Sequence, residues 1–188
     1  MPAYHRTKSQ IQQEYAEIVA AQKNPQRFGP VYERYYEQIF LFIIKRTGEE
    51  MLAADITSQV FLKAMLNLKK YQFKGLPFSS WLYRIAINEV NQYFRDNKGT
   101  RHISLESGGV THLMEEVDEP VDQEHIAHLL RTLDQLKPEE VQLVELRYFE
   151  RMRFKEIATI LHITENNAKV RLSRILKRLK KRMEQPAG

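Results

Sequence analysis

The stretch FSSWLYRIAINEVNQYFR, residues 78–95, has a helical pattern whose polar face could bind more than water. Leu82, Ala86 and Val90 recur at steps of four, so one face of this helix is expected to be buried. An open nucleic-acid strand is bound by cations that track phosphates, aromatic rings that stack on bases and amides that meet base edges. The opposite face supplies that mixture through Trp81, Arg84, Asn88, Asn91 and Arg95. The alternative for Trp81 is a place in the core, because large aromatic side chains are more often packed than displayed.

Residues 154–176, FKEIATILHITENNAKVRLSRIL, have the pattern of a helix-turn-helix. Apolar spacing predicts a short helix up to Leu161, a turn at 162–164 and a second helix with Thr164 as its N-cap. Such turns often have Gly where this chain has His162, because the position tends to require a positive φ. Histidine tolerates that conformation better than a β-branched residue would. The alternative is a helical hairpin without a nucleic-acid role.

The second helix of this motif would present side chains suited to the major groove of a duplex. Asn and Arg can pair bidentately with adenine and guanine edges, whereas Lys and Arg anchor phosphates. Eight Lys or Arg and no Asp or Glu lie between Lys169 and Arg182, more than the helix dipole alone would explain. The candidate duplex-binding residues are Thr164, Glu165, Asn166, Asn167, Lys169, Arg171, Ser173, Arg174 and Arg178.

A catalytic or metal-binding role has little support in the residue pattern. Asp122, His125 and His128 in DQEHIAH could share one helix face, but no further ligand with suitable spacing follows. The sequence has neither a glycine-rich phosphate loop nor a Ser or Cys nucleophile signature. We therefore expect no catalytic residue, no metal, no cofactor and no small-molecule substrate.

Composition favours a polyanionic partner in a reducing compartment. The 188 residues carry a net charge of +5, and the absence of cysteine excludes disulfides and thiolate metal sites. The longest apolar run, residues 39–44, is far shorter than the roughly 20 residues that cross a bilayer. The N-terminal stretch, residues 1–15, lacks the apolar core of a signal peptide, so we expect a cytoplasmic protein without membrane insertion.

Helical periodicity on both sides of an acidic middle segment predicts an all-α fold with two small domains. Residues 99–122 lose the period and gather Gly, Ser, Pro and acidic residues, so they are predicted to form a flexible linker. A solvated tether of this composition needs no further role. The predicted domains are therefore residues 1–98 and residues 123–188, and the second contains the helix-turn-helix.

The first domain is expected to position its polar helix with three further helices and a loop. Apolar periodicity predicts helices over residues 11–23 and 28–47, then a third with Ile56, Val60, Phe61, Ala64 and Leu68 on its buried side. Gly75 and Pro77 interrupt the pattern and predict a loop before the helix of residues 78–95. Ser79 or Ser80 is the expected N-cap of that helix.

Together these features resemble the extracytoplasmic-function group of bacterial sigma factors, the smallest relatives of sigma-70. The likeness spans about residues 11–183 and rests on three stretches in order: AQKNPQRFGPVYERYYEQIF, AADITSQVFLKAMLNLKKYQFKGLPFSSWLYRIAINEVNQYFR and LRYFERMRFKEIATILHITENNAKVRLSRILKRLK. The resemblance implies an alternative sigma factor. Such a protein binds core RNA polymerase and directs promoter-specific initiation, while catalysis belongs to the polymerase.

The resemblance also implies roles for individual residues of the first domain. It would dock on the beta-prime clamp of the polymerase and take up the melted non-template strand of the promoter −10 element, with one base flipped into a pocket of the loop at residues 71–80. The implied polymerase-binding residues are Asp55, Gln59, Phe61 and Leu62. The implied −10 residues are Phe73, Lys74, Phe78, Trp81, Arg84, Asn88, Asn91 and Arg95. The second domain would sit on the beta flap and read the −35 element as duplex through the helix-turn-helix residues named above.

The resemblance leaves three points open: Gln92, the acidic linker and a regulatory partner. The family usually has Asp where this chain has Gln92, so that position is left without a role. The family's linker threads towards the RNA exit path, where negative charge can imitate nucleic acid. An anti-sigma factor, commonly membrane-tethered, is a frequent partner in the family, and nothing in this sequence identifies one.

Two other functions compete with the sigma-factor interpretation. A stand-alone helix-turn-helix regulator would bind duplex DNA without docking on polymerase, but it leaves the first domain unexplained. A single-strand RNA binder would use the first domain and leave the helix-turn-helix without a role. Association with core polymerase separates both of these from a sigma factor.

Overall fold

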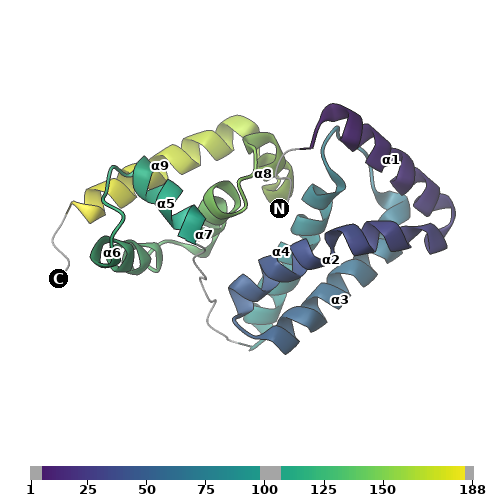
Figure 1. Cartoon of the computed structure of the whole chain (residues 1–188), viewed down its shortest axis with the longest axis horizontal. Helices are drawn as coiled ribbons and strands as arrows, with labels where there is room; N and C mark the ends of the chain where they lie inside the picture. The colour runs from purple at the N-terminus through teal and green to yellow at the C-terminus, as the bar shows by residue number, and fades with distance from the viewer. Residues whose placement is uncertain (1–5, 98–106, 185–188) are drawn as a thin grey trace. The chain divides into compact units, whose positions relative to one another are not determined.

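The computed structural model describes residues 6–97 and 107–184, and the chain divides into two compact units, residues 1–104 and 105–188. Every element within the described residues is helical and none is a strand, which confirms the predicted all-α fold (Figure 1). The first unit holds α1 (Lys8–Lys23), η1 (Pro25–Phe28), α2 (Gly29–Thr47), α3 (Glu50–Asn67), η2 (Leu68–Lys70) and α4 (Phe78–Asn97). The second holds α5 (Ser107–Glu116), α6 (Gln123–Leu133), α7 (Pro138–Val144), η3 (Glu145–Phe149), α8 (Phe154–Leu161) and α9 (Glu165–Met183).

Side-chain caps set the starts of α1 and η1 in the first unit. The Thr7 hydroxyl accepts from the Gln10 backbone N–H at 3.2 Å, and the Gln10 amide oxygen accepts from the Thr7 N–H at 2.8 Å, which makes a capping box for α1. Asn24 then ends α1 and caps η1. Helix α4 begins at Phe78, directly after the proline, so the prediction of a serine N-cap at 79 or 80 is wrong.

The core of the first unit forms where α2, α3 and α4 pack on one another. Each helix buries most of the apolar stripe that its spacing predicted, although Tyr32 of α2 is 39% exposed, and α1 adds Ile18 and Ala21. The buried side chains include Ile39, Phe42 and Ile43 of α2, Ile56, Val60 and Ala64 of α3, and Leu82, Ala86 and Val90 of α4. Because each stripe covers one face only, the opposite faces of α3 and α4 remain for solvent and partners.

Helix α5 corrects the prediction that residues 99–122 form one flexible linker. Val110, Leu113, Met114 and Val117 are buried, and their spacing is that of an amphipathic helix. The segment packs on η3, so it belongs to the second unit instead of joining the two units as a free tether. Neighbouring glycines and acidic residues masked this short apolar pattern in the sequence. The predicted linker residues before Ser107 lie outside the described part of the chain.

Gly109 permits the close approach of α5 to η3. A Cβ placed on Gly109 would lie 2.8 Å from Cγ of the Phe149 ring, well inside the normal contact distance. Next to this point, the His112 and Tyr148 rings lie 5.3 Å apart. The absence of a side chain at Gly109 therefore lets the two elements pack backbone against ring.

The rest of the second unit is built around α9, which contacts α6, α7 and α8 (Figure 1). The predicted helix start at Pro138 is confirmed. Buried apolar side chains from all four helices meet here: Leu129, Leu133, Val141, Val144, Ile157, Ile160, Leu172, Ile175 and Leu179.

None of the helices within residues 6–97 and 107–184 combines the length and the apolarity that a membrane span requires.

We expect Gly109→Ala to lower the free energy of unfolding of the second unit by about 1–3 kcal/mol, because the added methyl group overpacks the contact with Phe149. Chemical denaturation of the full chain, followed by helical circular dichroism, measures the change. Gly29→Ala is the matched control, since its Cβ would meet nothing within 4 Å at the start of α2. Equal stability changes in the two variants would contradict the close packing of α5.

Candidate nucleic-acid interface

The turn between α8 and α9 has the geometry predicted for a helix-turn-helix. His162 adopts φ 55° and ψ 42°, which confirms the expected left-handed position, and the Ile163 N–H donates to Ala158 O at 3.0 Å. The Thr164 hydroxyl accepts from the Asn167 N–H at 3.1 Å, as expected of an N-cap. These bonds fix the direction in which α9 leaves the turn.

Helix α9 has a buried face towards the core and an exposed face that carries the predicted duplex-binding residues. Ala168, Leu172, Ile175 and Leu179 are buried against the unit, as their spacing predicted. All nine predicted contact residues are exposed: Thr164, Glu165, Asn166, Asn167, Lys169, Arg171, Ser173, Arg174 and Arg178. Val170 is also exposed. The unit therefore presents amide, hydroxyl and guanidinium groups together from the first turns of one helix.

Several cations of α9 form ion pairs on the protein surface. Lys169 pairs with Glu165 at 2.7 Å, Arg178 pairs with Glu140 at 2.5 Å, and Lys180 pairs with Asp118. Exposed pairs of this kind stabilise a protein by about 0–1 kcal/mol, so phosphates can compete for these cations at little cost.

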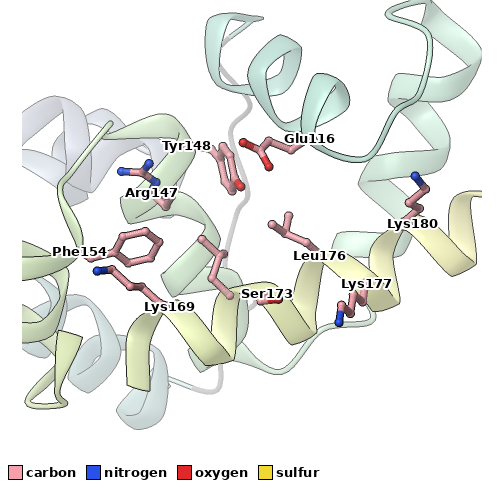
Figure 2. A pocket seen from close by; sticks show the side chains of 10 residues that line it. Glu116, Arg147, Tyr148, Phe154, Lys169, Ser173, Leu176, Lys177 and Lys180 are labelled. Atoms are coloured by element: carbon pink, nitrogen blue, oxygen red, sulfur yellow. The ribbon is translucent and has the colours of Figure 1, made fainter. Parts of the chain in front are cut away.

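A hollow of about 350 Å³ lies beside α9 (Figure 2). Its lining combines apolar side chains, Phe154, Leu172 and Leu176, with cationic ones, Arg147, Lys169, Lys177 and Lys180. Glu116 of α5 and Tyr148 of η3 complete it. Burial, with a smaller contribution from Glu116, raises the pKa of Tyr148 to about 12, so this hydroxyl stays protonated at neutral pH. Sequence reasoning missed Arg147 because it comes from η3, outside the two motif helices.

Helix α4 and the loop before it carry the predicted single-strand residues. Lys74, Asn88, Asn91 and Arg95 are exposed, and Phe73, Trp81 and Arg84 are partly exposed. The Trp81 ring packs at 5.2 Å from Tyr71 and 5.3 Å from Phe78, while part of the side chain remains exposed. Gln92 links Asp96, at 2.8 Å, to the Arg95 guanidinium on the same helix face.

Phe78 requires a correction, because it is a core residue with 1% of its surface exposed. Its ring lies 5.0 Å from Tyr71, 6.3 Å from Phe28 and 6.4 Å from Tyr35. As the first residue of α4, it points into the unit instead of towards the polar face. Phe78 therefore offers no face to a DNA strand, and we remove it from the candidate contact residues.

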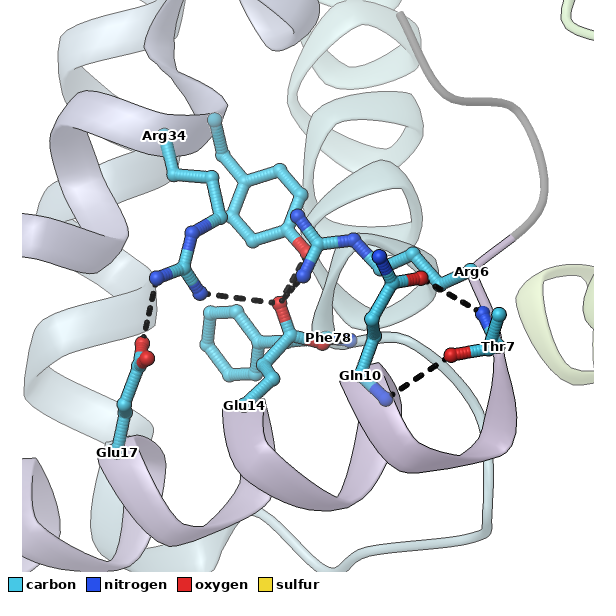
Figure 3. Close-up of polar contacts among 8 residues, drawn as sticks. Arg6, Thr7, Gln10, Glu14, Glu17, Arg34 and Phe78 are labelled. Carbon is cyan, nitrogen blue, oxygen red and sulfur yellow. Dashed lines mark hydrogen bonds and ion pairs between the residues drawn. The ribbon is translucent and has the colours of Figure 1, made fainter.

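A buried carboxylate joins the start of α4 to the helices around it (Figure 3). Glu14 of α1 is 2% exposed, and its Oε2 accepts from the Phe78 backbone N–H at 2.8 Å. Its Oε1 accepts from the Tyr35 hydroxyl and from Arg6 at 2.9 Å, with Arg34 at 3.6 Å. Burial, and next the Glu14 charge, raise the pKa of Tyr35, so its hydroxyl remains a donor. Sequence reasoning missed this cluster because its members are far apart in the chain.

Helix α3 exposes a row of side chains that includes three of the predicted polymerase contacts. Asp55 and Gln59 are exposed, Leu62 is 51% exposed, and Leu66 is 70% exposed. Large apolar side chains left in solvent along one face are typical of an interaction surface.

Phe61, also predicted to contact polymerase, is instead 3% exposed. Its ring packs at 4.8 Å from Tyr32 and 6.2 Å from Tyr36 of α2. Phe61 therefore packs between α3 and α2, behind the exposed row of α3, in keeping with its place in the predicted apolar stripe. We correct its expected role from a direct contact to a core position.

In DQEHIAH, His125 takes part in capping helix α6. Asp122 is the N-cap of α6 and accepts from the His125 backbone N–H at 3.0 Å and from the His125 imidazole Nδ1 at 2.8 Å. Glu119 lies 3.7 Å from His125 Nε2. In the described part of the chain, no group of three His, Cys, Asp or Glu side chains is placed to hold a metal ion.

Comparison with known proteins finds relatives for each unit. The family model for sigma-70 region 2 matches residues 31–100, and the model for sigma-70 region 4 matches residues 127–179. BldN, an ECF RNA polymerase sigma factor of Streptomyces coelicolor, is 27% identical over 146 residues, which cover 76% of this chain and 54%, about half, of BldN. The ECF sigma factor SigM of Bacillus subtilis is 25% identical over 152 residues, 80% of this chain and 91% of SigM.

A solved structure shares the fold of this chain. CnrH, in complex with the cytosolic domain of CnrY, matches with a TM-score of 0.59 and 17% identity. The match covers 93% of this chain and 99% of CnrH.

We expect the His125 imidazole to titrate above its ordinary pKa of 6.5, because it is hydrogen-bonded to Asp122. Its stabilisation is then complete below pH 6.5 and is lost as the pH rises through the folded pKa. The backbone N–H and the imidazole of His125 hold the Asp122 pKa below 3.8, so the carboxylate's contribution is present above pH 3.8 and is lost as the pH falls through the folded pKa.

NMR titration of His125 measures this shift. Asp122→Asn keeps an N-cap acceptor but removes the charge, so the imidazole pKa should fall towards 6.5 while α6 remains folded. The same titration midpoint in both proteins would show that the pair does not form.

Proposed function

The chain belongs to the extracytoplasmic-function group of the sigma-70 family, and on that premise we propose that it is an alternative sigma factor. It binds core RNA polymerase and directs initiation at specific promoters. The observation that carries the proposal is that the two units match different regions of a sigma factor. The region 2 and region 4 matches lie in different units, and each unit exposes a different set of nucleic-acid-binding groups.

The second unit reads the −35 element as duplex. A helix-turn-helix inserts the start of its second helix into the major groove, and the exposed Asn166, Asn167 and Arg174 lie in the first turns of α9. The cations of α9, with Arg147 at the edge of the hollow, are suited to the flanking phosphates.

The first unit reads the −10 element as a melted strand. Asn88, Asn91 and Arg95 supply amides and a cation on the exposed face of α4, and the partly exposed rings of Phe73 and Trp81 offer stacking surfaces. A base stacked on an aromatic ring contributes about 1–3 kcal/mol, which offsets part of the cost of unpairing.

Helix α3 docks on the polymerase, in the family on the clamp of the beta-prime subunit, while the second unit binds the beta flap. The exposed row from Asp55 to Leu66 supports this assignment because it combines a charge, an amide and solvated leucines. The proposed function places the protein in the cytoplasm, where the polymerase and the chromosome are. An anti-sigma factor that competes with polymerase is the expected regulatory partner.

Mixing the purified full chain with core RNA polymerase tests the function directly. Co-elution in gel filtration, together with new start sites that share two spaced elements in promoter-library transcription, is the expected result. No association with polymerase, combined with tight binding of the free chain to one duplex, would instead establish a stand-alone regulator.

Base contacts and phosphate contacts on α9 should be separable by substitution. Asn167→Ala or Arg174→Ala should reduce the preference for the natural −35 sequence by about 1–3 kcal/mol per lost contact. Lys177→Ala should weaken binding to all sequences alike and reduce the salt slope by about one. Holoenzyme binding to a −35 library at two salt concentrations measures both effects. If the three variants behaved alike, the assignment of α9 to the major groove would be wrong.

The exposed and buried neighbours on α3 should fail in different ways. Leu62→Asp should weaken association with core polymerase about tenfold or more, because it puts a charge into the apolar part of the docking face. Phe61→Ala should lower the free energy of unfolding by about 3–5 kcal/mol, because it empties a core position. Competition for core polymerase and chemical denaturation measure these changes. Leu41→Asp, at an exposed leucine of α2, is the matched control and should leave polymerase binding unchanged.

A further inference from the structure

Helix α1 contacts the proposed −10 site although it lies outside the residues that match the region 2 family model. The loop at residues 71–77 joins η2 to α4, and it includes Gly75 with a φ of +69°. Helix α1 contacts both ends of this loop and one ring within it.

The end of the loop is held by Glu14. Because Pro77 precedes α4, the first helical N–H is that of Phe78, and it donates to the Glu14 carboxylate at 2.8 Å. The other carboxylate oxygen is occupied by the Tyr35 hydroxyl and Arg6 (Figure 3). One oxygen of the buried Glu14 carboxylate therefore binds the start of α4, and the other binds Tyr35 of α2, so this group sets the position of α4 relative to α1 and α2.

The start of the loop is held by Gln22. Its side-chain amide donates to Leu68 O at 2.9 Å and to Tyr71 O at 3.1 Å. Both are backbone acceptors, so the bonds fix the chain path whatever the side chains there are. With Glu14 at the other end, the loop is clamped at both points where it meets a helix.

The middle of the loop is held by Tyr15, the residue that follows Glu14. Its ring stacks on Phe73 with centroids 4.3 Å apart and an interplanar angle of 14°. Phe73 is only partly buried, so one face of its ring is covered by Tyr15 and part of the side chain remains in solvent. Among the described residues, Tyr15 supplies the one aromatic ring that stacks on Phe73.

We propose that Tyr15 and Glu14 are positioning residues for the −10 strand, an inference that rests on the proposed function of this unit. Tyr15 backs Phe73, so that a base of the melted strand stacks on the opposite face of Phe73 and meets a ring already held in place. Glu14 sets the distance between that ring and the polar face of α4, where the neighbouring nucleotides are bound.

Preorganisation is the physical reason for this arrangement. An aromatic side chain on a seven-residue loop that includes a glycine would lose conformational freedom when a base stacks on it, and that loss would reduce the affinity. The stack on Tyr15 and the two clamps remove much of this freedom before DNA arrives. Recognition at one base position should therefore depend on a residue that does not touch the DNA.

Holoenzyme formed from core RNA polymerase and full-chain variants tests the proposal. The probe is promoter DNA that is single-stranded over the −10 element, with each base placed in turn at each position. Tyr15→Leu removes the stack and keeps an apolar side chain, whereas Tyr15→Phe keeps the ring. Glu14→Gln has only one amide oxygen, so it cannot accept at both sites of the carboxylate. Its matched control is Glu17→Gln, on the same helix, whose carboxylate pairs with Arg34 at 2.7 Å.

Tyr15→Leu should reduce the base preference at one −10 position about fivefold or more, a size set by the contribution of a stacked base. Core binding, −35 preference and the other −10 positions should change less than about twofold, because their contact residues lie elsewhere. Tyr15→Phe should retain the wild-type base preference, because it keeps the ring. Glu14→Gln should reduce the affinity for the strand, and Glu17→Gln should not.

Unchanged −10 preferences in Tyr15→Leu would overturn the inference while leaving the proposed function intact. If Tyr15→Leu instead reduced base preference at all −10 positions and also weakened core binding, the inference would be overturned as well, because a merely structural role predicts that result. A wild-type holoenzyme with no base preference in the −10 strand would refute the proposed function itself.

Discussion

The buried Glu14 carboxylate is the constraint around which the first unit is arranged. A charge removed from water is costly unless donors surround it, and here the donors come from three separate segments: Arg6, Tyr35 of α2 and the first N–H of α4. The carboxylate is satisfied only when α1, α2 and α4 are in place together. Because one of its partners is the backbone at the start of α4, this requirement also fixes where the polar face of α4 and the loop before it lie.

Under the proposed function, the two units bind two different forms of DNA, and each uses one exposed helix face. In α9 the proposed binding groups are carried by one rigid helix, and several of its cations form weak surface pairs such as Lys169 with Glu165. A duplex has a regular shape, so a rod that fits a groove is sufficient. A melted strand has no fixed shape, and the first unit instead combines the α4 face with a loop whose ring is held by α1.

Much of the fold and of the proposed duplex-binding site could be predicted because the responsible interactions are local. The apolar stripes of α2, α3, α4 and α9 follow from spacing within each helix, and the left-handed His162 and the Thr164 cap follow from neighbouring residues. Aromatic residues were less predictable. A phenylalanine can serve equally well in a binding site or in a core. Phe61 is buried because it packs on Tyr32 and Tyr36. Phe78 is buried because it packs on Tyr35 and Phe28.

The sequence by itself determined the all-α class, the helix-turn-helix, the basic character of α9 and the mixed aromatic, amide and cationic composition of α4. Each of these depends on residue type and on periods of three or four along one helix. Only the tertiary structure decided that residues 107–116 form a helix packed on η3, that Arg147 lines the hollow beside α9, and that Glu14, Tyr35 and Phe78 meet. Those contacts join residues distant in the chain, and their formation depends on which apolar faces pack together, which no local pattern specifies.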